Sequence, residues 1–110
     1  MKINTVLAEI TNGLFKYLKE NGLDVNLREF DLKEYCPWSI RSLPNIKEEW
    51  GKTIPSIEIR LNGKPLWSNI IILDGYICFL EEKITPLSDP NAFDITIKWF
   101  HDLEKRLENL

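Results

Sequence analysis

Residues 55–82 read PSIEIRLNGKPLWSNIIILDGYICFLEE, and this stretch decides the fold. Polar and apolar residues alternate strictly from Ser56 to Leu61, which is the pattern of a half-buried strand. Asn62-Gly63 and Asp74-Gly75 then separate three strand-like runs. Both dipeptides favour positive φ at the two central positions of a tight turn. The stretch therefore predicts a three-stranded antiparallel meander with two-residue hairpin loops.

These short loops also fix which residues lie opposite each other. The expected pairs are Leu61 with Lys64, Ile59 with Leu66, Leu73 with Tyr76, and Ile72 with Ile77. One face would then hold Ile57, Ile59, Leu61, Leu66, Ile70, Ile72, Ile77 and Phe79. The other face would hold Trp67, Ile71, Leu73, Tyr76, Cys78 and Leu80, diluted by Glu58, Arg60 and Asn69. Because both faces are largely apolar, the second also needs a cover, either a helix, residues 33–53 or another protein chain.

The residues before the meander predict a helix and a strand. Apolar residues at helical spacing favour a helix over residues 4–21, with Gly22 as its C-cap. Alternatively, Thr11-Asn12-Gly13 could start the helix and leave residues 2–9 as a strand. Residues 24–31 favour a strand with a bulge or an early end between Leu27 and Phe30, where the apolar phase slips.

Two further helices are expected from capping signals. Asn45 followed by Glu48 resembles a capping box, which predicts a short helix at 46–50 in the otherwise irregular segment 33–53. Asp89-Pro90 marks the start of a long amphipathic final helix. The prediction is a single α+β domain over residues 1–110. In it, one mostly antiparallel four-stranded sheet packs with N- and C-terminal helices.

Composition limits the classes of function. The 110 residues carry a net charge of −3, which argues against a nucleic-acid binder because such proteins need a basic face. Two cysteines, Cys36 and Cys78, suit a reducing compartment, so we expect a cytoplasmic location. With one histidine and no Cys-x-x-Cys, no metal site or cofactor is predicted. No apolar run is long enough for a signal peptide or a membrane span.

Residues 14–66 resemble part of a thioredoxin or glutaredoxin fold. Residues 18–25 (LKENGLDV) resemble the first helix leading into the second strand, and residues 53–56 (TIPS) resemble the loop with a cis proline. Residues 61–65 (LNGKP) resemble the hairpin that follows. The resemblance implies that Pro55 is a cis-proline candidate and that the first strand comes from residues 2–9. The family's Cys-x-x-Cys is missing, because residues 1–13 contain no cysteine.

Few residues offer catalytic chemistry. Cys36-Pro37-Trp38-Ser39 looks like a monothiol form of the thioredoxin-family motif, so Cys36 is the one catalytic alternative. Cys78 alternates with strand residues and is expected to be a small packing residue. His101 lies opposite the apolar face of the final helix, where it is expected to be solvated.

We therefore expect a non-enzymatic, small acidic protein-interaction module of the inhibitor, immunity or accessory-subunit type. Its partner would be another protein or a second copy of the chain, bound through exposed aromatic and aliphatic residues. The alternative is a thioredoxin-like redox protein that uses Cys36, and a third possibility is single-stranded nucleic acid stacked on the aromatics. The candidate partner-binding residues are Trp38, Trp50, Trp67, Ile71, Tyr76 and Leu80.

Overall fold

The computed structural model describes residues 3–31, 53–79 and 82–108. The elements follow the chain as helix α1 (Ile3–Glu20), strands β1 (Val25–Asp31), β2 (Thr53–Leu61), β3 (Lys64–Leu73), β4 (Tyr76–Phe79) and β5 (Glu82–Pro86), and helix α4 (Ala92–Glu108). The α+β class is confirmed. The helix over residues 4–21 is confirmed too, so the alternative strand at residues 2–9 is wrong. The predicted helix at 46–50 lies outside the described residues.

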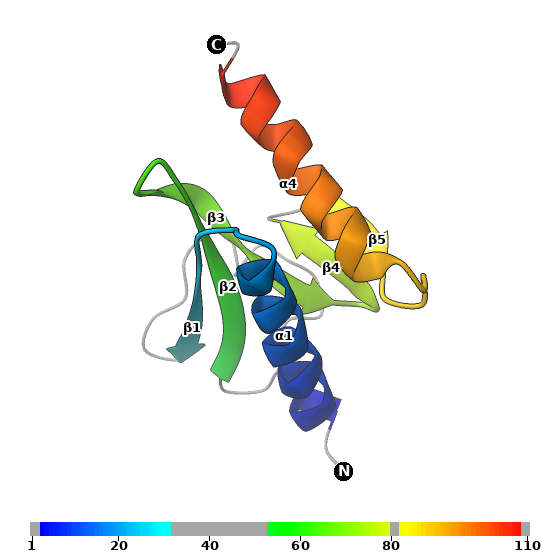
Figure 1. Cartoon of the computed structure of the whole chain (residues 1–110). Helices are drawn as coiled ribbons and strands as arrows, with labels where there is room; N and C mark the ends of the chain where they lie inside the picture. Colours follow the sequence, from blue (N-terminus) through cyan, green and yellow to red (C-terminus); the bar gives the residue numbers. More distant parts are fainter. Residues whose placement is uncertain (1–2, 32–52, 80–81, 109–110) are drawn as a thin grey trace.

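The strands form one antiparallel five-stranded sheet in the order β1-β2-β3-β4-β5 (Figure 1). The sequence predicted four strands and missed β5. Asn62 and Gly63 have φ values of 54° and 80°, and Asp74 and Gly75 have values of 57° and 78°. Positive φ at both central residues marks the predicted type I′ turns. Both hairpins of the meander are therefore confirmed.

The register follows the predictions except at one irregularity between β2 and β3. Leu61 lies opposite Lys64, Leu73 opposite Tyr76 and Ile72 opposite Ile77, as expected. The predicted Ile59–Leu66 pair is wrong, because the register shifts between Glu58 and Arg60 and Ile57 then lies opposite Ile70. The bulge predicted in β1 is also wrong, since β1 pairs with β2 in unbroken register from Val25–Ile59 to Asp31–Thr53. The irregularity thus lies between β2 and β3, where three residues of β3 (66–68) stand opposite the single residue Ile59 of β2.

Both described helices lie on one face of the sheet, which we call the helix face (Figure 1). In α1, Leu7, Leu14 and Leu18 recur at helical spacing and are buried. From α4, Trp99 reaches Phe79 of β4, with ring centroids 5.0 Å apart. The buried apolar strand residues on this face are Val25, Ile57, Ile59, Ile70, Ile72, Ile77 and Phe79.

Part of the opposite face of the sheet is also buried within the single chain. Its buried residues include Ile54, Ser56, Ile71, Leu73 and Cys78. The prediction that both faces are covered is thus confirmed for these described residues. Cys78 is a buried packing residue, as predicted.

Helix α4 begins close to its predicted cap. The Asp89 carboxylate accepts a hydrogen bond from the Asn91 backbone N–H at 2.8 Å, and Ala92 N–H bonds to the Asp89 carbonyl at 3.1 Å. An acidic side chain here satisfies free backbone donors and complements the helix dipole. The capping role of Asp89 is confirmed, although regular helix starts only at Ala92.

Pro55 is not a cis proline. No cis peptide bond occurs among the described residues, and Pro55 lies within the extended strand β2, opposite Glu29 of β1. The ladder between β2 and β3 ends at the pair of Ile57 with Ile70. A proline beyond that point removes no ladder hydrogen bond toward β3, so the ordinary trans peptide fits. The first strand that the thioredoxin resemblance requires is likewise replaced by helix α1.

Candidate functional site: the edge strand and the cleft beside it

The sequence-predicted contact residues do not form one exposed surface in the described structure. Ile71 is only 1% exposed, so its predicted role as a partner contact is wrong for the folded single chain. Tyr76 is half-buried, and its ring lies 4.6 Å from the Lys83 ammonium, which occupies part of its surface. Cys36, Trp38, Trp50 and Leu80, together with the side chain of Trp67, lie outside the described structure.

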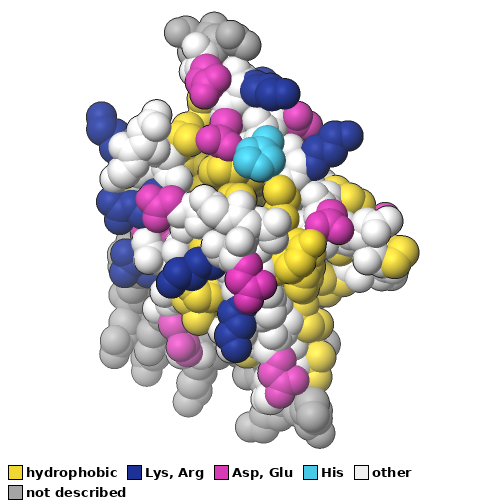
Figure 2. Space-filling model, viewed as in Figure 1, with side chains coloured by type: hydrophobic (Ala, Val, Ile, Leu, Met, Phe, Trp, Pro, Cys, Tyr) yellow, Lys and Arg dark blue, Asp and Glu magenta, His cyan; other side chains and the backbone are white. Residues whose placement is uncertain are grey.

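The described acidic, cysteine and histidine side chains are not clustered. No group of three or more His, Cys, Asp or Glu side chains that could hold a metal ion occurs among them. His101 lies on the exposed side of α4, where its Nδ1 is 2.9 Å from Glu104, so its predicted solvation is confirmed. Charged side chains of both signs are interspersed on the face seen in Figure 2. Neither helix of the described ranges combines the length and the hydrophobicity of a membrane span.

Strand β1 carries the most exposed large hydrophobic side chain of the described chain. It is an edge strand, and among the described strands it pairs only with β2. Its residue Leu27 is 42% exposed, although its cross-strand partner Ile57 is completely buried. An exposed leucine alone is ordinary, but one on a sheet edge lies beside backbone groups that can bind another strand.

The direction of those backbone groups follows from one hydrogen bond. Arg60 N–H donates to the Asp24 carbonyl at 2.9 Å, which makes these two residues a hydrogen-bonded pair just beyond β1. Hydrogen-bonded and non-hydrogen-bonded pairs alternate along an antiparallel ladder. Asn26 and Arg28 therefore turn their backbone groups toward β2. Val25, Leu27 and Glu29 turn theirs outward, away from the sheet.

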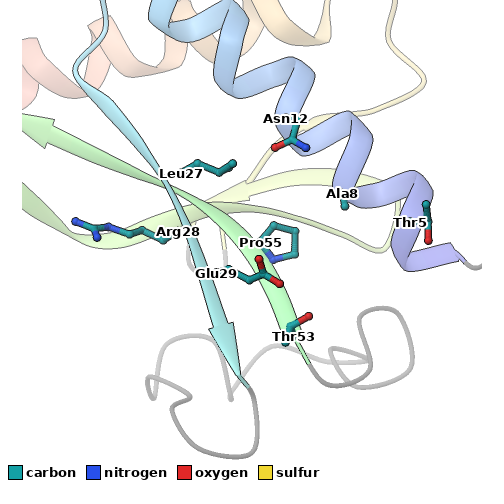
Figure 3. Close-up of a pocket in the computed structure, with 8 residues that line it drawn as sticks. All are labelled: Thr5, Ala8, Asn12, Leu27, Arg28, Glu29, Thr53 and Pro55. Carbon is teal, nitrogen blue, oxygen red and sulfur yellow. The ribbon is translucent and has the colours of Figure 1, made fainter.

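A cleft separates the first half of α1 from β1 and β2. Its volume is about 450 Å³, and Figure 3 shows Leu27 and Pro55 on the strands below the helix. The helix turns Thr5, Ala8 and Asn12 toward it, residues that recur along one side of α1. Because these side chains are short, they do not reach across to Leu27. The small residues of α1 are thus the physical reason why Leu27 stays exposed.

Charged and polar side chains fix β1 to β2 on the opposite face. Glu58 lies 3.1 Å from Arg28 and 3.6 Å from Arg60, and Asn26 donates to it at 3.5 Å. Arg28 extends away from α1 in Figure 3. One carboxylate between two guanidinium groups holds both in place and leaves this part of the surface positive. The edge strand is therefore held in register with its outer side free for contact in the described chain.

Sequence reasoning placed Val25 and Leu27 on one face but missed this site. The available signal was Leu27 on a strand that the order of elements places at the sheet edge. The missing information was the path of α1, which decides how much of β1 is covered. Comparisons with protein-family models, with curated proteins and with solved structures found no match for this chain.

Proposed function

We propose that this chain is a non-enzymatic protein-interaction module whose contact surface is the outer edge of β1 with the adjoining cleft. The single observation that carries the proposal is the exposure of Leu27 on an edge strand with outward-pointing backbone groups. Proteins commonly bind an extended segment at such an edge, because main-chain hydrogen bonds and alternate side chains are both available there.

The two edges of the sheet differ in a way that supports this assignment. Strand β5 has five residues, begins at Glu82-Lys83, ends at Pro86 and has an irregular register against β4. Short length, charge, proline and bulges are the usual protections of an edge against unwanted pairing. Strand β1 has seven residues in regular register and contains no lysine, proline or glycine. Strand β1 also carries the charges of Arg28, Glu29 and Asp31, but its greater length, its regular register and the exposed Leu27 make it the described edge better suited to pairing.

The test compares two substitutions at the exposed large hydrophobic residues. Leu27→Lys adds a charge at the proposed surface, and Val6→Lys adds the same charge on α1 at a residue that is 38% exposed and does not line the cleft. We expect the immobilised wild-type chain and the Val6→Lys chain to retain the same protein from a cell extract or from a solution of the chain itself. Leu27→Lys should retain about tenfold less, which corresponds to about 1.4 kcal/mol of binding free energy.

Equal retention by all three chains would place the contact elsewhere and refute the proposal. Circular dichroism of each variant provides the folding control, since both substituted side chains are already exposed and should leave the fold intact.

A further inference from the structure

We propose that the partner at this edge is a second copy of the chain, bound by antiparallel pairing of β1 with β1 around Leu27. This inference rests on the proposed function and names its partner. Such pairing would join two five-stranded sheets into one continuous sheet across a two-fold axis, the commonest symmetry of homo-oligomers.

The backbone of β1 suits pairing with itself. A two-fold axis perpendicular to the sheet makes the strands antiparallel and keeps both helix faces on the same side. Centred on Leu27, it places Leu27 opposite Leu27 of the second copy and Val25 opposite Glu29 of the second copy. These are the residues whose backbone N–H and C=O groups point outward, so each pair would exchange two hydrogen bonds.

The side chains distinguish this register from its neighbours. A centre at Arg28 would place two arginines directly opposite each other, and a centre at Glu29 would do the same with two glutamates. Like charges in directly opposite positions destabilise a strand pair. The Leu27 centre instead pairs the two exposed leucines and places Arg28 opposite Asn26, whose amide oxygen can accept from a guanidinium group. It is the one of these three registers that buries apolar surface without a like-charge pair.

The short helix side chains leave room for the second copy. Thr5, Ala8 and Asn12 border the cleft above Leu27, so α1 does not overhang the pair of leucines. The paired segment, Val25–Glu29, is short, and the contact belongs with small protein–protein interfaces. We therefore expect a dimer that forms in a concentration-dependent way rather than a permanent one.

Analytical ultracentrifugation of the purified chain tests the state of association, from about 1 µM to about 1 mM, the range where small interfaces associate. The mass should rise from 12.9 kDa toward twice that value in the wild type and in Val6→Lys. It should stay at the monomer value in Leu27→Lys.

Disulfide trapping tests the register in a Cys36→Ser background. Opposed residues in a hydrogen-bonded antiparallel pair have Cα atoms about 5.5 Å apart, which a disulfide can bridge. Leu27→Cys should therefore form a covalent dimer under mild oxidation. Matched single cysteines at Arg28 and at Lys83 of β5 should cross-link at least about tenfold more slowly, because those positions do not face their own copies.

A chain that stays monomeric throughout, with no selective trapping at Leu27, would overturn the self-association proposal. Faster trapping at Arg28 would overturn the Leu27-centred register. If the monomeric chain still captured a foreign protein in a Leu27-dependent manner, the proposed function would stand and only its partner would change. A chain that stays monomeric and also shows equal retention of partners by the wild type, Val6→Lys and Leu27→Lys would refute both proposals.

Discussion

Tyr17 of α1 donates a hydrogen bond from its phenol to the carboxylate of Asp94 at the start of α4. The two residues are 77 positions apart in the sequence, and the Tyr17 ring also contacts Phe93 with centroids 5.7 Å apart. This pair of contacts links the two helices on the helix face. It lies at the surface, so water and salt compete with it.

Loss of the Tyr17 phenol should change the pH dependence of stability. The hydrogen bond to Asp94 is the main cause that raises the pKa of Tyr17, with smaller contributions from desolvation and from the charges of Asp94 and Glu20. A raised pKa means that the folded state favours the protonated phenol. Its stabilising contribution is therefore complete below the unfolded-state pKa of 10.0 and is lost as the pH rises through the folded-state pKa.

Thermal unfolding of the wild type and of Tyr17→Phe measures this effect. The wild type should melt at the higher temperature at neutral pH, and the difference should shrink as the solution becomes strongly alkaline. Asp94→Asn is the control, because it keeps an acceptor but removes the charge and should bring the pKa of Tyr17 back toward its ordinary value. A difference that stays constant with pH would mean that the phenol is not linked to folding.

Gly63→Ala and Gly13→Ala should have opposite effects on the free energy of unfolding. Gly63 has a φ of 80°, which an alanine adopts only at a cost of about 1–2 kcal/mol. Gly13 lies inside α1, and an added Cβ would meet Phe93 only at an ordinary contact distance of 4.0 Å. Alanine there should stabilise the chain by about 0.5–1 kcal/mol. Urea unfolding measures the free energy of unfolding of both variants. Changes of equal sign would contradict the turn assignment.

Ile57→Ala should be strongly destabilising. Ile57 is completely buried and faces Ile70 because of the register shift between β2 and β3. Truncation of such a residue leaves a cavity and costs about 2–5 kcal/mol. Val6→Ala, at an exposed position of α1, should change stability by no more than about 0.5 kcal/mol. Chemical denaturation compares the two, and a small effect at Ile57 would argue against the described register.

The Cys78 thiol should be protected in the native state. It is 5% exposed and lies 3.9 Å from the Leu73 carbonyl oxygen. In a Cys36→Ser chain we expect a thiol reagent to react with Cys78 at least about 100-fold more slowly than in denaturant, because reaction requires opening of the sheet. Rapid labelling of the native chain would show that the opposite face is accessible.

Local signals in the sequence predicted most of the fold. Asn62-Gly63 and Asp74-Gly75 specify their turns through backbone sterics alone, so the hairpins could be recognised without any tertiary information. Strand β5 was missed because Leu80-Glu81, just before it, lacks such turn residues and the strand itself ends in a proline. The resemblance to thioredoxin also suggested a cis peptide at Pro55, whereas the peptide lies in an extended strand.

Features that depend on packing could not be predicted in the same way. The register shift between Glu58 and Arg60 brings Ile57 opposite Ile70. Packing these two apolar side chains together stabilises the fold only once the helices cover that face. The exposure of Leu27 depends on short α1 side chains more than a dozen positions earlier in the sequence. The amphipathic pattern of β1 shows which side chains share a face, but it does not show how far the neighbouring helix extends over them.

The consecutive strand order has a consequence for the folding pathway. Only two residues separate consecutive strands from β2 to β5 in the sequence, so their pairing closes short loops, whereas pairing of β1 must close the segment between Asp31 and Thr53. We expect the four-stranded part to form first and β1 to add to it last. Pulse-labelling hydrogen exchange would test this order, with later protection expected for Asn26 than for Ile72. Newly made chains would then acquire the edge that carries Leu27 only when folding is nearly complete, which would delay their association during synthesis.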